Sequence, residues 1–203
     1  YEQQKQLLAQ SEIKLLHAQV NPHFLFNALN TLSAVIRRDP DHARKLVLSL
    51  STFFRKNLKR SSDEVTLGDE IEHVKAYLEI EKARFSDHLM IDFDIDESLL
   101  HIRLPAFSLQ PIVENAIKHG TSQLFGVGEV RLHSWREGDD ILISVEDNAG
   151  LYQSKPRGDG LGMNLVDRRI KARYGDRFGV SVESEADKFT RIVIRVPKVV
   201  VEA

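Results

Sequence analysis

Four polar side chains recur at helical spacing within an apolar stretch near the start of the chain. They are Gln19, His23, Asn27 and Asn30. On the opposite side of the same predicted helix lies a seam made of Leu25, Leu29, Leu32 and Ile36. Residues three or four apart share a helix face, so we expect His23 to point outward, where its imidazole is open to transfer chemistry. The alternative is an ordinary surface histidine on a helix that pairs with another.

Pro22 allows two arrangements around this histidine. In the first, it kinks a continuous helix by freeing the carbonyl of Ala18. In the second, it occupies the first turn of a new helix capped by Asn21. The positive end of that helix would disfavour an imidazolium and favour a transferred anion at His23. The sequence is compatible with both arrangements.

A second group of polar side chains lies in the segment LQPIVENAIKHG, which is predicted to be helical. Asn115, Lys118 and His119 fall at positions i, i+3 and i+4, away from the apolar stripe of this helix. An amide oxygen is a suitable ligand for Mg²⁺, and a lysine is a mobile positive charge for phosphate. The trio could therefore hold a metal–polyphosphate, or it could be a solvated helix face.

An aspartate ends a predicted strand on its apolar side. Residues 141–147 alternate so that Asp147 shares a face with Ile141, Ile143 and Val145. A carboxylate in such a place needs a partner, and the exocyclic amine of a purine is one candidate. The alternative is that residues 147–150 form a simple turn.

Glycines precede the next predicted helix. Gly158, Gly160 and Gly162 could let backbone N–H groups cradle phosphate. They do not directly follow a strand, which argues against a Rossmann fingerprint. The Lys-Ser/Thr of a P-loop is also missing.

The first third of the chain is predicted to be a helical hairpin. Apolar residues keep helical spacing on both sides of a turn at residues 39–41. Two such helices cannot cover all their apolar side chains, so we expect a homodimer with a four-helix core. Residues 1–19 would continue the first helix as a coiled-coil stalk. We place the domain boundary between residues 62 and 63, giving domains 1–62 and 63–203.

The remaining two thirds alternate between helical and strand patterns. Helices are predicted at residues 66–85, 107–119 and 160–174, and strands at 90–96, 130–135, 141–147, 180–183 and 191–196. The fold class is therefore α+β: a helical-hairpin domain followed by a two-layer α/β sandwich with helices on one face of one sheet.

The composition excludes several kinds of protein. The 28 basic and 30 acidic residues leave a net charge of 28 − 30 = −2, which disfavours nucleic-acid binding. The absence of cysteine excludes disulfides and thiolate metal sites. No apolar run approaches the roughly 20 residues of a membrane span. Because the chain starts at Tyr1 in a helical pattern, we expect it to be a portion of a longer protein.

The order and spacing of five segments are more specific than any single motif. The segments are AQVNPHFLFNALNTL, YLEIEKARF, LQPIVENAIKHG, VEDNAG and GDGLGMNLVDRRIKARYG. In this order the chain resembles, over nearly its whole length, the sensor histidine kinases of the LytS/YehU type. The resemblance implies a phosphoacceptor hairpin followed by an ATP-binding domain of the gyrase–Hsp90–kinase–MutL (Bergerat-type) fold.

The resemblance also implies roles for individual residues. His23 matches the phosphorylated histidine. Asn27 resembles the amide one turn later that could orient a water for dephosphorylation of the partner; the alternative is a polar residue that caps the dimer seam or bonds to a backbone carbonyl. Asn115 matches the Mg²⁺ ligand, with Lys118 and His119 beside the phosphates and nucleotide. Asp147 matches the aspartate that binds adenine. The glycines of the ATP lid correspond to Gly160 and Gly162.

The implied activity is ATP-dependent phosphorylation of His23, followed by transfer to an aspartate of a response regulator, expected to be of the LytTR type. The cofactors are ATP and Mg²⁺. A membrane sensor region is expected before Tyr1, which makes this chain the cytoplasmic portion of an inner-membrane protein. Glu114 is a candidate base, because Phe24 stands where other histidine kinases carry an acid.

Two departures from the family pattern support alternatives. Ala149 and Leu151 replace glycines of the usual DNGxG motif, which would stiffen the lid hinge. These replacements favour one alternative, a degenerate dimeric scaffold. A second alternative is an ATP-driven switch that forms no phosphoenzyme, as in other proteins of this ATPase fold, and the PHFLFN hairpin argues against it.

Overall fold

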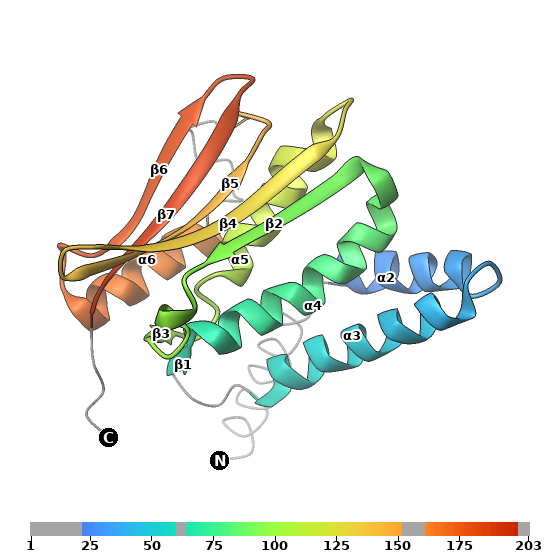
Figure 1. The fold of residues 1–203 in the computed structure, drawn as a ribbon, viewed down its shortest axis with the longest axis horizontal. Helices are drawn as coiled ribbons and strands as arrows, with labels where there is room; N and C mark the ends of the chain where they lie inside the picture. Colours follow the sequence, from blue (N-terminus) through green and yellow to red (C-terminus); the bar gives the residue numbers. More distant parts are fainter. Residues whose placement is uncertain (1–21, 60–63, 152–160, 199–203) are drawn as a thin grey trace, which may run out of the picture. The chain divides into compact units, whose positions relative to one another are not determined.

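The computed structural model describes residues 22–59, 64–151 and 161–198. The helices are α2 (Pro22–Val35), α3 (Pro40–Lys59), α4 (Leu67–Phe85), α5 (Gln110–Asn115) and α6 (Leu161–Tyr174) (Figure 1). The strands are β1 (Glu64–Thr66), β2 (Leu89–Ile95), β3 (Arg103–Pro105), β4 (Gly128–Glu137), β5 (Asp140–Asp147), β6 (Gly179–Glu185) and β7 (Phe189–Pro197). No helix among these residues is long and apolar enough to cross a membrane.

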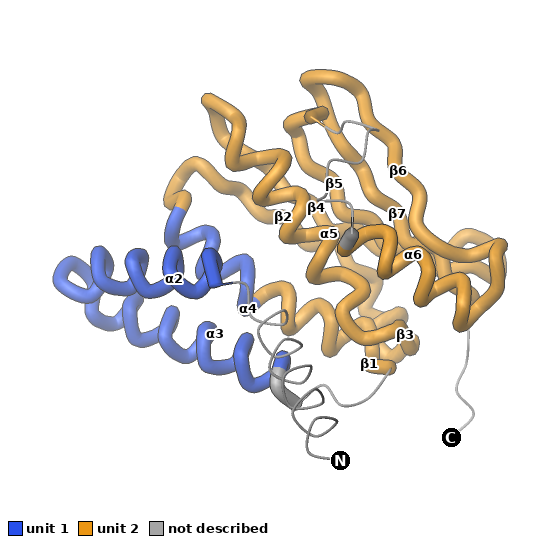
Figure 2. The backbone as a smooth tube through the Cα atoms, turned by 180° about the vertical axis from the view of Figure 1, so that it is seen from behind, with its two compact units in different colours: residues 1–61, 76–84 blue, residues 62–75, 85–203 orange. Residues whose placement is uncertain are grey.

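The chain divides into two compact units, and α4 contributes to both (Figure 2). Unit 1 holds α2, α3 and residues 76–84 of α4, whereas unit 2 holds residues 64–75 and the chain from Phe85 onward. The boundary between residues 62 and 63 stays a prediction. The stalk predicted at residues 1–19 lies outside the described residues.

Unit 1 contains the predicted helical hairpin. The turn before α3 ends in a cap, because the Asp39 carboxylate accepts a hydrogen bond from the His42 amide at 2.9 Å. Pro40 follows at the first helical position, where its missing N–H costs nothing. The unit is held by an aromatic cluster in which the Phe24 ring lies 5.0 Å from the rings of both Phe53 and Tyr77.

The buried face of α2 differs from the predicted seam. Phe24 and Ala28 are buried, whereas Leu29 and Ile36 are exposed. The reason is that α2 packs in unit 1 against α3 and residues 76–84 of α4, a contact that the sequence pattern did not indicate. The predicted seam is therefore not the core of the hairpin within a single chain.

Unit 2 is built on a five-stranded sheet with the strand order β2-β4-β5-β7-β6. The β2 and β4 strands are parallel, and all other neighbours are antiparallel. Helices α5 and α6 lie along one face of this sheet (Figure 1). The α+β fold class is thus confirmed. A small antiparallel pair, β1 with β3, was not predicted.

The start of α4 follows its sequence signal. The Thr66 hydroxyl accepts from the Asp69 amide at 3.1 Å, and the Asp69 carboxylate accepts from the Thr66 amide at 3.1 Å. This reciprocal pair satisfies two amides at the helix end that would otherwise lack partners. The predicted helix therefore begins where its capping residues indicate.

The helix predicted at residues 107–119 is shorter and less regular than expected. Its α-helical part is α5, and residues Ala116–Gly120 form a π-helical turn, followed by a 3₁₀ turn at Thr121–Gln123. Single π turns are frequent at functional sites, because they change the direction in which side chains project.

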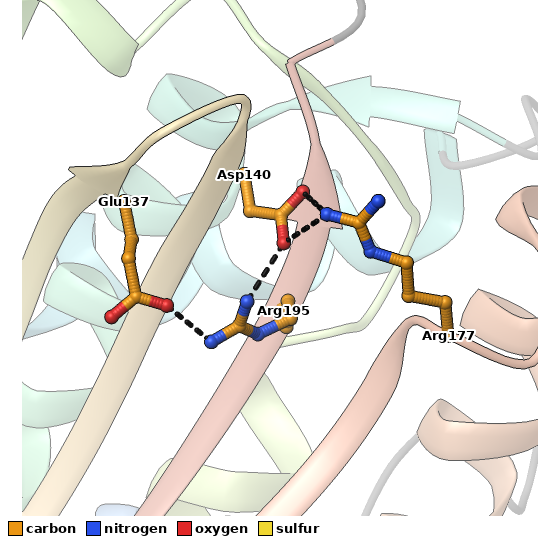
Figure 3. A network of polar contacts seen from close by, with 4 residues as sticks. All are labelled: Glu137, Asp140, Arg177 and Arg195. Atoms are coloured by element: carbon orange, nitrogen blue, oxygen red, sulfur yellow. Dashed lines mark hydrogen bonds and ion pairs between the residues drawn. The ribbon is translucent and has the colours of Figure 1, made fainter.

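An ion-pair network fastens the β4–β5 hairpin to the neighbouring strand and loop (Figure 3). The buried Asp140 carboxylate accepts hydrogen bonds from Arg177 Nη2 at 2.8 Å and from Arg195 Nη1 at 2.7 Å. Arg195 also donates to Glu137. The two arginine bonds lower the pKa of Asp140. This network lies at the start of β5, at the opposite end of the strand from Asp147.

Candidate phosphoacceptor and nucleotide site

The predicted phosphoacceptor lies in the first turn of α2. His23 is exposed, as the polar stripe predicts, and Asn27 is half-buried one turn later. The Asn27 amide nitrogen lies 3.3 Å from Nδ1 and 3.5 Å from Nε2 of the imidazole. The two side chains can therefore act on one reacting group. Residue 21 lies outside the described part, so both arrangements at Pro22 stay open.

The side chain after His23 anchors this turn of the helix. Phe24 is buried in the aromatic cluster of unit 1, which directs the preceding residue toward solvent. At the position where many histidine kinases carry an acid, this phenylalanine thus contributes packing rather than charge. It leaves no carboxylate at the position next to the imidazole.

Asp147 ends β5 on the buried side, as the alternation predicts. It is 5% exposed, and Oδ1 accepts a hydrogen bond from the Ala149 amide at 2.9 Å. Burial raises the pKa of its carboxyl, against the opposing effect of backbone hydrogen bonds from Ala149 and Gly150. A carboxylate held in this way can accept hydrogen bonds from a ligand amine, and burial strengthens such bonds.

Because Gly120 has no side chain, there is room beside it for the Asp147 carboxylate. A Cβ atom on this glycine would lie 2.7 Å from Cγ and 2.9 Å from each carboxylate oxygen of Asp147. The π turn that ends at Gly120 is thereby brought against the end of β5. No alternating or helical pattern marks this pair, and the sequence interpretation assigned Gly120 no role.

The turn after Asp147 is shaped by its neighbours. Asn148 accepts from the Glu129 amide at 2.8 Å and donates to the Val127 carbonyl at 3.0 Å. Gly150 has φ of +61°, and a Cβ there would lie 2.2 Å from the Glu185 carbonyl oxygen. This position therefore requires glycine. Ala149 is buried, so it is accommodated in place of the usual glycine.

Asn115, Lys118 and His119 do not lie on one regular α-helix. Asn115 is the last residue of α5, whereas Lys118 and His119 lie in the π turn. Asn115 and His119 are half-buried, and Lys118 is exposed. The three groups therefore come from residues close together in the sequence, at the end of α5 and in the π turn that ends at Gly120.

The residue before Asn115 has partners of its own. Glu114 Oε1 accepts from Gln110 Nε2 at 2.7 Å, and burial raises the pKa of the Glu114 carboxyl. A carboxyl with a raised pKa can take up a proton nearer neutral pH than an exposed glutamate.

Of the lid glycines, only Gly162 lies within the described residues. A Cβ there would lie 3.1 Å from the Pro111 Cβ, which brings the start of α6 close to α5. Gly158 and Gly160 fall outside the described part.

These residues fit a nucleotide with a magnesium ion through the chemistry of their donor groups. Within the described residues, no three His, Asp or Glu side chains are grouped to hold a metal on their own. A hard cation here would therefore depend on the Asn115 amide together with phosphate oxygens. The buried Asp147 carboxylate is a candidate for the contact to a base.

Comparison with known proteins decides the family. Over 197 residues, 97% of its length, the chain is 63% identical to the sensor histidine kinase BtsS of Escherichia coli. The chain belongs to the sensor histidine kinases. It is also 36% identical over 210 residues to the sensor protein LytS of Bacillus subtilis. The histidine kinase family matches residues 11–89, and the histidine kinase-, DNA gyrase B-, and HSP90-like ATPase family matches residues 106–200.

As a sensor histidine kinase, the chain is the kinase core, and it spans 35% of the length of both BtsS and LytS. Its fold is similar to the histidine kinase domain of a blue-light activated histidine kinase from Erythrobacter litoralis. That likeness has a TM-score of 0.52 at 12% identity and covers 92% of this chain and 91% of the other.

Proposed function

We propose that this kinase core is an ATP:protein-histidine phosphotransferase that phosphorylates His23. The observation that carries the proposal is the exposed imidazole of His23 beside the Asn27 amide, in a chain with 63% identity to a sensor histidine kinase. An exposed imidazole can reach a phosphoryl donor without disturbing the aromatic cluster behind it.

In this proposal, four side chains bind the nucleotide and its metal ion. Asp147 accepts the exocyclic amine of adenine, and Asn115 is a ligand of Mg²⁺. Lys118 and His119 lie beside the phosphates, where an ammonium neutralises charge that spreads over the phosphoryl oxygens. Bound Mg²⁺ supplies further charge neutralisation at those oxygens.

The chemical step is an in-line displacement at phosphorus. One imidazole nitrogen of His23 bonds to the γ-phosphorus, the bond to the bridging oxygen breaks, and ADP leaves. The imidazole proton passes to solvent or to a carboxylate, for which Glu114 is the candidate. Gly160 and Gly162 belong to the lid in this scheme, and the lid amides bind phosphate oxygens.

The phosphoryl group then passes to an aspartate of a response regulator, which we propose to be of the LytTR type. In a separate hydrolytic step, Asn27 orients a water molecule that attacks the phosphorus of the partner's phosphorylated aspartate, so that the bond to the carboxyl oxygen breaks and inorganic phosphate leaves. A membrane sensor region before Tyr1 would place this core on the cytoplasmic side of the inner membrane. This arrangement fits the fraction of the relatives' length that the chain spans.

A homodimer through the hairpin completes the proposal. Large apolar side chains on α2, in the turn after it and on α3 are between 49% and 68% exposed. They are Phe26, Leu29, Ile36, Val47 and Leu48. A second hairpin would cover them, because exposed apolar patches of this kind mark protein contacts.

The test is labelling with γ-³²P ATP, followed by acid and alkali treatment of the protein. A phosphohistidine loses its label in acid and keeps it in alkali, whereas a serine ester does not show that pattern. We expect His23→Gln to abolish the label while ATP affinity and dimer mass stay near wild type. His42→Gln is the matched control, since His42 is another exposed histidine of the hairpin.

Other outcomes support other functions. Undiminished label in His23→Gln would move the phosphoacceptor elsewhere. ATP hydrolysis by the wild-type protein without any stable label would support an ATP-driven switch. Binding of ATP with neither label nor hydrolysis would support a degenerate scaffold, which the replacements Ala149 and Leu151 favour.

A further inference from the structure

The segment that leads into α5 has an unusual backbone conformation. Residues 106–109, here called the 106–109 loop, connect β3 to α5. Phe107 in this loop has φ of +61°, in the left-handed region. A bulky aromatic residue adopts that conformation where surrounding contacts impose it, and such positions concentrate at functional sites.

Glu70 on α4 binds this loop with both carboxylate oxygens. Oε1 accepts from the Phe107 amide at 2.9 Å, and Oε2 accepts from the Leu109 amide at 2.9 Å. Glu70 is 0% exposed. A buried carboxylate is tolerated where its oxygens accept hydrogen bonds, and its two acceptors match two N–H donors. Glu70 thus fixes both amides around the turn of the loop.

His73 makes a second attachment one helical turn later on the same face of α4. Its Nε2 lies 2.6 Å from Oε1 of Gln110, the first residue of α5, and its ring lies edge-on to Phe107 at 6.2 Å. With this assignment of the Gln110 amide, the imidazole is the donor. Gln110 Nε2 in turn donates to Glu114 at 2.7 Å. These hydrogen bonds therefore connect His73 through Gln110 to Glu114, the residue before Asn115.

We propose that Glu70 and His73 are positioning residues of the nucleotide site, which set the place of α5 and so of Asn115. This inference rests on the proposed function, in which Asn115 is the Mg²⁺ ligand. The α5 helix has only six residues, too few to keep its place by its own hydrogen bonds. Asp147, by contrast, lies on a strand that is paired on both sides. Loss of these attachments should therefore disturb the Mg²⁺ contact more than the adenine contact.

The test is Glu70→Gln, measured by calorimetry with two ligands. The glutamine has one acceptor oxygen, so its NH₂ group would face one of the two backbone N–H donors. We expect the affinity for ATP with Mg²⁺ to fall about tenfold and the rate constant of His23 labelling about ten- to a hundredfold, since small misplacements are costly in catalysis. Adenosine, which lacks phosphates and binds no Mg²⁺ here, should bind almost as well as to the wild-type protein.

Glu72→Gln is the matched control, because it makes the same chemical change at an exposed position of the same helix. It should leave both affinities and the labelling rate unchanged. If circular dichroism shows that Glu70→Gln does not fold, Gln110→Ala decides, because it removes only the second attachment. It should show the same selective loss to a smaller degree.

Equal losses for adenosine and for ATP with Mg²⁺, or no loss for either, in the deciding variant would overturn the positioning role while leaving the proposed function intact. Absence of ATP binding and label in the wild-type protein would instead overturn the proposed function, and the positioning role with it. The wild-type measurement thus separates the two failures.

Discussion

Replacing Gly120 with alanine should damage the nucleotide site through a single side chain. A Cβ at this position would lie 2.7 Å from Cγ of Asp147, whereas ordinary van der Waals contact begins at 3.4 Å. The two groups must therefore separate by 3.4 − 2.7 = 0.7 Å. The carboxylate cannot move freely, because Oδ1 is bonded to the Ala149 amide.

The size of the effect follows from this overlap. Forcing one extra carbon into a packed site costs about 1–3 kcal/mol. A displaced carboxylate also loses its hydrogen bond to adenine, which contributes a similar amount and corresponds to about ten- to a hundredfold in affinity. We expect Gly120→Ala to lower the melting temperature and to weaken ATP binding in calorimetry by that factor. GTP should be affected less, because the bond to the adenine amine is the one disturbed.

Two controls make this prediction sharp. Gly126→Ala adds the same methyl group where no heavy atom lies within 4 Å, so stability and affinity should stay at wild-type values. In an Asp147→Ala background, Gly120→Ala should lose most of its thermal cost, because the clashing group is gone. The reasoning is refuted if Gly120→Ala binds ATP normally, or if its thermal cost is the same with and without the Asp147 carboxylate.

Three further predictions follow from the other polar contacts. Because burial raises the pKa of Asp147, its ionised form opposes folding at neutral pH, and protonation stabilises the fold as pH falls through that raised pKa. Asp147→Asn should therefore raise the melting temperature at pH 7 while it weakens ATP binding; a lower melting temperature at pH 7 in scanning fluorimetry would contradict this. Asp140 has a lowered pKa, so its arginine bonds stabilise the fold at pH values above ~3.9, the pKa of an aspartate in the unfolded chain. This contribution is lost as the pH falls through the pKa of Asp140 in the folded protein. Asp140→Asn should melt earlier than Glu137→Gln at pH 7, and the gap between them should close in acid; a gap that is constant with pH would count against the network. Asn27→Ala should prolong the lifetime of the phosphorylated response regulator while labelling of His23 stays near normal, with Asn30→Ala as the exposed control; equal lifetimes for Asn27→Ala and wild type would exclude the role of the amide.

Much of the fold could be predicted because its signals are local. The capping pair Thr66 and Asp69 marks the start of α4, and strict alternation along β5 places Asp147 on the buried side. Such patterns depend only on residues a few positions apart, and their periods identify helices and strands directly. The sequence also placed His23 on an exposed helix face. Its role as phosphoacceptor stays a prediction.

The structure differs from the predictions made from the sequence where a contact joins distant parts of the chain. The predicted seam on α2 is partly exposed, because residues 76–84 of α4 take part in unit 1 and select Phe24 and Ala28 for burial. The segment after Asn115 forms a π turn rather than the predicted α-helix. Neither result has a periodic signal in the local sequence.

By itself, the sequence predicted most of the helices and strands and proposed which residues could carry the chemistry, since both predictions depend on residue type and short-range spacing. The tertiary structure alone decided how those residues are held. Glu70 meets the Phe107 amide across 37 residues, and Gly120 leaves room for a carboxylate on another element. Such contacts depend on how whole elements pack, because a side chain finds its distant partner only when the backbone between them has folded.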